Sequence, residues 1–193
     1  MIKIGITGGI GSGKSVVSSV LAMEDIPVYK ADDESKRLTD TSPVIREKLK
    51  TLIDESIYSN NKLDRQRLAS LIFNDEVLLQ KVNDVIHPEV KNDFKRWAVK
   101  QTAKYCALES AILIESRFEK EVDVVLMVCA PVELRLSRIR LRDGLTEMDI
   151  LKRMSHQLPD DVKRKQADYV IINDDVQPVI PQIEHFIRYL SKI

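Results

Sequence analysis

The chain has 193 residues, 44% of them hydrophobic, and its 30 basic residues balance its 30 acidic residues. This length allows one domain with a buried core, and the balanced charge gives no general attraction to nucleic acid or to an anionic membrane. No apolar stretch approaches the roughly 20 residues that a bilayer-spanning helix needs, and Lys3 interrupts the apolar start where a signal peptide would run. We therefore expect a cytoplasmic protein whose partners include neither nucleic acid nor a membrane.

The first predicted elements are a short strand, a glycine-rich loop and a helix. The apolar run around Ile4 is typical of a buried strand. Gly8–Ser15 then fits the pattern G-x-x-x-x-G-K-[ST] of a phosphate-binding P-loop, and apolar residues at helical spacing follow. Glycines let the backbone pass close to a ligand, so that successive N–H groups surround phosphate oxygens. We expect Lys14 to reach the β- and γ-phosphates and the Ser15 hydroxyl to sit on Mg²⁺.

A second strand is predicted over Ile26–Tyr29, and an acidic group containing Asp32 and Asp33 follows it. Ligands of open α/β sheets bind at the carboxyl ends of the strands. This position favours Asp32 or Asp33 as a base for an incoming hydroxyl, or as an indirect Mg²⁺ contact. The same residues equally suit the N-cap of the next helix, so the pattern leaves both interpretations open.

The stretch from Ser42 to Lys104 has a mostly helical pattern. Ser42 and Pro43 resemble an N-cap with a first-turn proline, and Asp64 resembles the cap of a second helix. A third helix follows, and we expect Pro88 to open a fourth. This stretch is much longer than an ordinary crossover between strands. It therefore predicts an inserted helical lobe, a natural place for a second substrate.

Residues 61–64 read N-K-x-D, which is also a guanine-reading motif of GTP-binding switches. The motif follows the polar pair Ser59-Asn60 rather than an apolar strand, and no D-x-x-G occurs in the chain. A turn followed by a helix cap is the better interpretation of these four residues.

Two apolar runs with β-branched residues, Tyr105–Leu108 and Val122–Cys129, predict central strands. Glu109 ends the first of them, and Glu115 follows six residues later. An acid at such a place can hold a water on Mg²⁺, as in other P-loop proteins. A cap or a surface acid is the alternative for both residues.

The next helix begins at Pro131 and carries Arg135, Arg138 and Arg142 on one face. Gly144 ends it, and a capping box that begins at Thr146 opens the next helix. Two arginine-rich helices joined by a glycine turn favour a lid that neutralises phosphate charge and excludes water. Two solvated amphipathic helices are the alternative.

A last strand is predicted over Tyr169–Ile172, and Asn173 after it is placed to face the nucleotide base. The pattern as a whole predicts an α/β fold of the P-loop NTPase type, similar to nucleotide kinases, with three layers around a parallel five-stranded sheet. We expect a single domain over 1–193. Its core covers about 1–40, 104–135 and 167–193, its helical substrate lobe about 41–103, and its arginine-rich lid about 136–160.

Several motifs spread along the chain are more specific than the P-loop. They are TGGIGSGKS at 7–15, Asp32, LDRQRL at 63–68, IHPEV at 86–90, ESAILIE at 109–115, RLRDG at 140–144 and ADYVIIN at 167–173. Together they resemble the dephospho-coenzyme A kinase family over nearly the whole chain. The resemblance implies transfer of the γ-phosphoryl group of ATP to the ribose 3′-hydroxyl of dephospho-CoA, with Mg²⁺, as the last step of coenzyme A synthesis in the cytoplasm.

The resemblance also implies roles for single residues. Asp32 matches the proposed base, Arg142 a lid arginine that faces the phosphates, and Arg65 and His87 positions in the acceptor lobe. Glu109 is expected to bind the substrate together with Asp32, Arg65 and His87. The nucleotide is assigned to Gly11, Ser12, Gly13, Lys14, Ser15, Val16 and Asn173, with Ser15 also holding Mg²⁺. The expected partners are ATP and dephospho-CoA, and the expected state is a monomer or a weak homo-oligomer.

The chain departs from the family pattern at three positions: Lys30 replaces an acid, Val16 a threonine and Ala111 a proline. Lys30 leaves Asp32 as the single candidate base of its element. Another small-molecule kinase, such as a nucleoside monophosphate kinase, is the nearer alternative. A non-catalytic nucleotide-binding module is the farther one.

Overall fold

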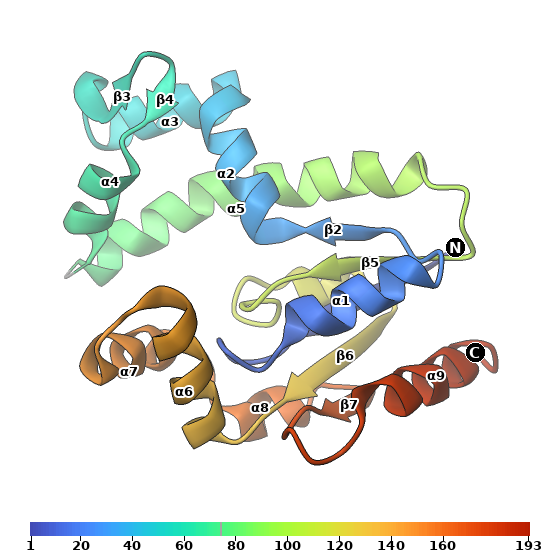
Figure 1. The fold of residues 1–193 in the computed structure, drawn as a ribbon. Coiled ribbons are helices and arrows are strands. Elements are labelled where there is room, and N and C mark those ends of the chain that lie inside the picture. Colours follow the sequence, from blue (N-terminus) through green and yellow to red (C-terminus); the bar gives the residue numbers. More distant parts are fainter. Residues whose placement is uncertain (74) are drawn as a thin grey trace. The chain divides into compact units, whose positions relative to one another are not determined.

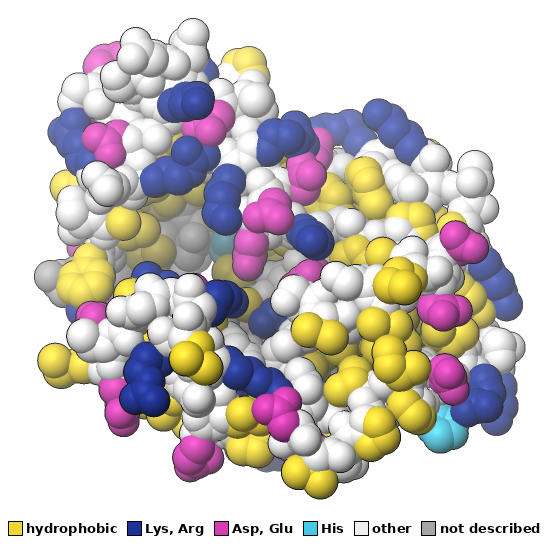
Figure 2. Space-filling view, in the orientation of Figure 1, with side chains coloured by type: hydrophobic (Ala, Val, Ile, Leu, Met, Phe, Trp, Pro, Cys, Tyr) yellow, Lys and Arg dark blue, Asp and Glu magenta, His cyan; other side chains and the backbone are white. Residues whose placement is uncertain are grey.

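The computed structural model describes residues 1–73 and 75–193. Within these residues the chain forms two compact units, one of residues 1–29 with 100–193 and the other of residues 30–99. Figure 1 shows the elements of both units, coloured along the chain. Basic and acidic side chains are interspersed over the face seen in Figure 2, in agreement with the balanced charge of the sequence.

The first unit is built on a five-stranded sheet with the order β2-β5-β1-β6-β7 (Figure 1). Strand β1 is central and runs parallel to β5 on one side and to β6 on the other, and β7 runs parallel to β6. The strands are β1 (Ile2–Thr7), β2 (Val28–Lys30), β5 (Tyr105–Glu109), β6 (Val124–Cys129) and β7 (Tyr169–Ile172). The predicted parallel α/β sheet is therefore confirmed. Strand β2 begins after Pro27, which has no N–H to give to a ladder.

The core of this unit joins the sheet to two helices, α1 (Lys14–Met23) and α9 (Val179–Leu190). These helices contact each other, and α1 also contacts β1 and β5. Buried side chains from the strands and from both helices form one apolar cluster that includes Ile4, Leu126 and Leu21. One face of α9 forms an apolar stripe against this cluster, because its positions Ile183 and Phe186 are fully buried. The packing fixes β1 and α1, which carry the two ends of the glycine-rich loop.

The rest of the first unit follows β5 and β6. It comprises η2 (Phe118–Glu121), α6 (Val132–Asp143), α7 (Glu147–Ser155) and α8 (Asp160–Arg164). Gly144 ends α6 with a φ of +66°, the left-handed conformation usual at a helix C-terminus. The Thr146 hydroxyl accepts the N–H of Asp149 at 3.2 Å, so the predicted cap of the following helix is confirmed.

The second unit is mostly helical. Its elements are α2 (Ala31–Thr41), α3 (Pro43–Leu52), η1 (Glu55–Ile57), β3 (Tyr58–Ser59), β4 (Lys62–Leu63), α4 (Arg65–Ile72) and α5 (Glu76–Val99). Ser42 caps α3 by accepting the Ile45 N–H, and Asp64 caps α4 by accepting the Arg67 N–H at 2.9 Å. Both caps agree with the sequence-based prediction.

The prediction that Pro88 opens a separate helix is wrong. Pro88 lies inside α5, which runs without a break from Glu76 to Val99. The buried residues Ile86 and Val90 flank the proline on the same apolar stripe. Packing of this stripe outweighs the one hydrogen bond that a proline removes from a helix interior. The predicted third and fourth helices are therefore one element.

The alternative in which Asp32 or Asp33 caps a helix is also wrong. The N-cap of α2 is Lys30, whose side chain makes no capping hydrogen bond. The reason is that β2 runs directly into α2, so the capping position falls on the last strand residue. Both aspartates lie in the first turn instead, where a negative charge interacts favourably with the helix dipole.

The N-K-x-D segment contributes part of the turn and the second strand, β4, of a β-hairpin that pairs β3 with β4. Asn60 and Asn61 occupy its turn with φ of +49° and +63°, a conformation that asparagine tolerates well. Arg46 donates to the side-chain oxygen of Asn61 at 2.9 Å. The turn-and-cap interpretation of this segment is thus confirmed.

In the part of the chain that the structure describes, no helix has both the length and the apolar character needed to cross a membrane.

Candidate active site

The glycine-rich loop connects the carboxyl end of β1 to the N-terminus of α1, as predicted. Gly8 has a φ of +147°, and a Cβ there would lie 2.2 Å from the Val128 carbonyl oxygen. Gly13 has a φ of +91°, and a Cβ there would lie 2.0 Å from Nδ2 of Asn173. Both positions require glycine for conformation and for space. The loop therefore lies tightly against β6 and against the residue that follows β7.

Lys14 begins α1 and is buried against the loop. Its ammonium group donates to the carbonyl oxygens of Gly8 at 2.9 Å and Gly9 at 3.3 Å. These bonds place the positive charge over the loop backbone. Ser15 and Val16 come next in the first turn of α1 and are exposed. A helix N-terminus with its unpaired N–H groups and a nearby ammonium is a suitable environment for a phosphate group.

Asn173 holds the loop rather than facing open solvent. It is buried, and its Nδ2 donates to the Ser12 carbonyl at 2.9 Å. Its Oδ1 accepts from Arg138 at 3.3 Å, and Arg138 also donates to the Gly11 carbonyl at 3.4 Å. The segments that follow the carboxyl ends of β1 and β7 thus meet at the glycine-rich loop. The structure brings the predicted nucleotide residues Gly11–Lys14 and Asn173 together.

The three arginines predicted on one face of α6 have different surroundings. Arg135 is 4% exposed, donates to the Ile10 carbonyl at 2.8 Å and pairs with Asp160 at 2.9 Å. Arg138 also contacts the loop, so a purely solvated face is wrong for these two residues. Arg142, the lid arginine expected to face the phosphates, is exposed and pairs with its neighbour Asp143 at 2.7 Å. The hydrogen bond from Arg142 lowers the pKa of the Asp143 carboxyl.

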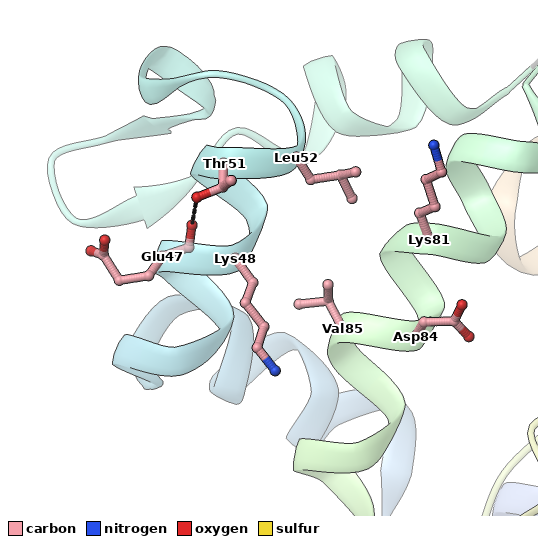
Figure 3. Close-up of a pocket in the computed structure, with 7 residues that line it drawn as sticks. All are labelled: Glu47, Lys48, Thr51, Leu52, Lys81, Asp84 and Val85. Carbon is pink, nitrogen blue, oxygen red and sulfur yellow. Dashed lines mark hydrogen bonds between the residues drawn. The ribbon is translucent and has the colours of Figure 1, made fainter.

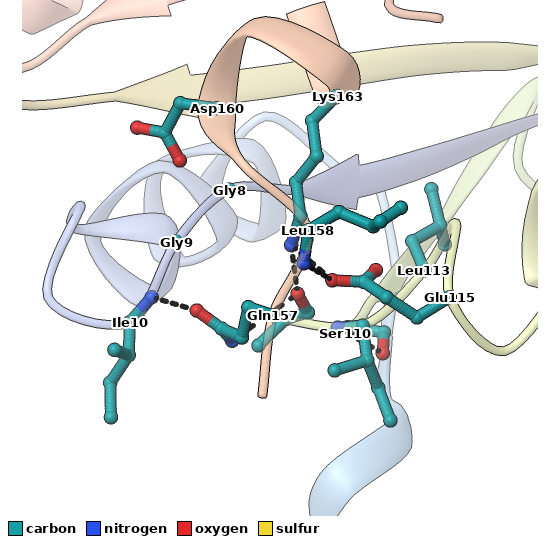
Figure 4. A network of polar contacts seen from close by, with 12 residues as sticks. Gly8, Gly9, Ile10, Ser110, Leu113, Glu115, Gln157, Leu158, Asp160 and Lys163 are labelled. Atoms are coloured by element: carbon teal, nitrogen blue, oxygen red, sulfur yellow. Dashed lines mark hydrogen bonds and ion pairs between the residues drawn. The ribbon is translucent and has the colours of Figure 1, made fainter. Parts of the chain in front are cut away.

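The residues after β5 form a second polar group beside the loop (Figure 4). Glu109 ends β5 half-buried and lies opposite Ile6 of β1. Glu115 pairs with the fully buried Lys163 at 2.8 Å and accepts the Leu158 N–H at 2.8 Å. Glu115 is therefore an ion-pair partner, neither a cap nor a surface acid.

Sequence reasoning missed Gln157 and Lys163, which complete this group. Gln157 accepts the Ile10 N–H at 2.9 Å, and Lys163 donates to the Ala111 carbonyl at 2.7 Å. Lys163 lies in a run of acidic and basic residues, which by itself is typical of a solvated helix. The local pattern around these two residues contains no signal that would have distinguished them.

The remaining assigned residues belong to the second unit. Asp32 is exposed in the first turn of α2. Arg65 begins α4 and donates to Asp40 at 2.7 Å and to the Lys36 carbonyl at 2.8 Å, which ties α4 to α2. Burial tends to raise the pKa of Asp40, but hydrogen bonds from Arg65 and from the Leu63 N–H leave this pKa below its ordinary value.

His87 is a partly buried residue in the middle of α5. Burial lowers its pKa, and the nearby positive charge of Lys91 lowers it further, although Asp84 acts in the opposite direction. The imidazole is therefore neutral over a wider pH range than an exposed histidine. The same unit contains a hollow of about 510 Å³ between α3 and α5, with Leu52 and Val85 as apolar lining (Figure 3).

Comparison with known proteins agrees with this geometry. The family model described as dephospho-CoA kinase matches residues 2–178. A curated dephospho-CoA kinase from Bacteroides fragilis is 47% identical over 190 residues, covering 98% of this chain and 93% of that protein. The structure of TT1252 from Thermus thermophilus has a TM-score of 0.84 and 34% identity, with 99% and 96% of the two chains covered. A dephospho-CoA kinase from Campylobacter jejuni, at 21% identity, shares the fold with a TM-score of 0.68 over 98% and 96%. This chain therefore belongs to the dephospho-CoA kinase family.

Proposed function

We propose that this protein transfers the γ-phosphoryl group of ATP to the ribose 3′-hydroxyl of dephospho-CoA, giving coenzyme A and ADP. The observation that carries the proposal is the family match over residues 2–178, which includes an intact P-loop. The reaction is the last step of coenzyme A synthesis, and we place it in the cytoplasm. The protein acts as a monomer or a weak homo-oligomer.

The nucleotide binds at the glycine-rich loop. The N–H groups of Gly11, Gly13, Lys14 and Ser15 surround the phosphates, because this is the point where the loop opens into the helix N-terminus. Val16 lies beside them in the exposed first turn of α1. Lys14 exchanges its bonds to the carbonyl oxygens of Gly8 and Gly9 for bonds to the β- and γ-phosphates. Asn173 supports the loop next to the base. These roles account for the tight packing around the glycines at the two ends of the loop, Gly8 and Gly13.

Mg²⁺ enters with ATP. The residues present fit this ion because the Ser15 hydroxyl is exposed in the first turn of α1. No group of three or more metal-ligating side chains occurs among the described residues, so the phosphates supply most of the ligands. When bound, the ion neutralises charge on the transferring group.

The acceptor hydroxyl is oriented by Asp32, which accepts its proton late in the transfer. Arg142 leaves its pair with Asp143 to face the phosphates, and Arg65, His87 and Glu109 contact the acceptor. The helical lobe over about 41–103 holds the acceptor, and the lid over about 136–160 closes on the core of 1–40, 104–135 and 167–193. Positioning and electrostatic stabilisation supply most of the catalysis in this type of reaction.

The proposal is tested by ADP release from ATP–Mg²⁺ with dephospho-CoA as acceptor, beside AMP, CMP, adenosine and pantetheine. We expect release only with dephospho-CoA, and its loss in Lys14→Ala. Stimulation by a nucleoside monophosphate instead of dephospho-CoA would contradict the proposal. Slow hydrolysis that no acceptor stimulates would favour a nucleotide-binding module.

A further inference from the structure

Ile10, in the glycine-rich loop, is held from two sides by residues far along the chain. Its N–H donates to Gln157 Oε1 at 2.9 Å, and its carbonyl accepts from Arg135 Nε at 2.8 Å. The Arg135 guanidinium also fills the space beside Gly9, where a Cβ would lie 2.1 Å from a guanidinium nitrogen. The shape of the loop at Ile10 therefore depends on side chains outside the loop.

The two partners of Ile10 lie at opposite ends of the arginine-rich segment that contains α6 and α7. Arg135 is in the first turns of α6, and Gln157 follows the end of α7. An ion pair of 2.9 Å between Arg135 and Asp160 joins the two ends. Both ends of the segment thus form hydrogen bonds to the same P-loop residue, Ile10.

The orientation of the Gln157 carboxamide is set by its two partners. The Ile10 N–H can only donate, so it must face Oε1. The Ala111 carbonyl can only accept, and it faces Nε2 at 3.4 Å. Figure 4 shows Gln157 extended toward Ile10. Its side chain therefore bridges the P-loop and the loop after β5 in one orientation.

The residues after Gln157 hold its backbone in place. The Leu158 N–H and the Lys163 ammonium both bind Oε1 of Glu115, each at 2.8 Å (Figure 4). Lys163 is fully buried and also binds the Ala111 carbonyl at 2.7 Å. A buried ion pair with these additional bonds is costly to break. Gln157 is therefore a fixed support rather than a mobile surface side chain.

We propose that Gln157 is a positioning residue for the nucleotide. By accepting the Ile10 N–H, it keeps the loop N–H groups of Gly11, Gly13 and Lys14 directed at the phosphates. Because Gln157 also lies at the end of the arginine-rich segment, it links the position of that segment to the shape of the P-loop. This inference rests on the proposed function only in that the loop receives the phosphates of ATP.

The test uses the full chain with Gln157→Met, which keeps the length of the side chain and removes its polar atoms. Gln166→Met is the matched control, since Gln166 is exposed and lies beyond α8, between α8 and β7. We measure hydrogen exchange of the Ile10 amide by NMR, and ADP–Mg²⁺ affinity by calorimetry. In Gln157→Met we expect exchange to quicken at least about tenfold and the ADP Kd to rise about tenfold, or ~1.4 kcal/mol. Gln166→Met changes neither.

Kinetics separate positioning from general destabilisation. We expect Gln157→Met to raise the KM for ATP about tenfold while the KM for dephospho-CoA stays within about twofold. If Gln157→Met does not fold, Gln157→Asn serves, because it keeps the amide but shortens the side chain by one bond of roughly 1.5 Å. Unchanged Ile10 exchange with unchanged ADP affinity in a folded variant overturns the inference. Since both of these readouts need no acceptor, failure of the proposed reaction would leave them interpretable.

Discussion

Asn173 and Gly13 are packed so closely that a Cβ on Gly13 would lie 2.0 Å from the Asn173 amide nitrogen. That nitrogen donates to the Ser12 carbonyl at 2.9 Å. The residue after the last strand therefore supports the turn at which the P-loop becomes α1. Any side chain at Gly13 must displace Asn173 from this bond.

Gly13→Ala should therefore weaken nucleotide binding. We expect at least about a tenfold rise in the ADP–Mg²⁺ Kd, since the new methyl group and the φ of +91° both act against the loop. Calorimetry measures the effect. Gly144→Ala is the control, because Gly144 has a φ of +66° but no atom within 4 Å of an added Cβ. It should cost about 1–2 kcal/mol of stability, because alanine adopts the left-handed conformation poorly, and leave the Kd unchanged. Equal Kd values for Gly13→Ala and the wild type would contradict the supporting role.

Asp32→Asn should lower turnover far more than nucleotide affinity. We expect kcat to fall about 10²–10⁴-fold, the range for loss of a general base, while the ADP Kd stays nearly constant. Steady-state kinetics and calorimetry measure the two quantities. Asp33→Asn is the matched control, since Asp33 lies in the same turn of α2 and pairs with Lys36. Near-normal turnover in Asp32→Asn would show that Asp32 is only a first-turn acid.

Lys163→Met should destabilise the fold because it leaves the Glu115 carboxylate without its buried cation. Lys163 is 0% exposed and the Glu115 side chain 18%. Loss of one partner of a buried pair costs about 3–5 kcal/mol. Urea unfolding of Lys163→Met measures this, with the exposed Lys165→Met as control. The double variant Lys163→Met with Glu115→Gln should recover part of the loss. A cost below about 1 kcal/mol, the range of a surface pair, would contradict the buried ion pair.

His87 should make the stability of the protein fall as the pH is lowered. Burial, together with Lys91, lowers the folded-state pKa of His87 below its ordinary value. The unfolded chain therefore binds the proton first, and stability that is fully present above about pH 6.5 declines below it. Urea unfolding between pH 7.5 and 5.5 measures this change. His87→Gln should flatten it, whereas an identical pH dependence in the variant would contradict the assignment.

The sequence predicted features that depend on residues close together in the chain. The P-loop, the Ser42 and Asp64 caps and the asparagine turn follow from local backbone chemistry, and the structure confirms them. The inclusion of Pro88 in α5 could not be predicted in this way. It depends on burial of Ile86 and Val90, which tertiary packing decides.

Contacts between segments far apart in the chain could not be predicted from the sequence either. The spacing of Arg135, Arg138 and Arg142 predicted a shared helix face, but spacing does not specify what each residue contacts. Two of them contact the P-loop, and the third pairs with its neighbour. Gln157 and Ile10 are 147 positions apart, so no local pattern connects them.

The proposal that the ribose 3′-hydroxyl is the acceptor is tested most directly by comparing dephospho-CoA with its 3′-deoxy analogue. ADP release from ATP–Mg²⁺ is followed for both compounds under the same conditions, and the product is analysed by mass spectrometry. We expect ADP release with dephospho-CoA, formation of a product heavier by one phosphoryl group, and neither with the analogue. Equal turnover of the 3′-deoxy analogue would contradict it.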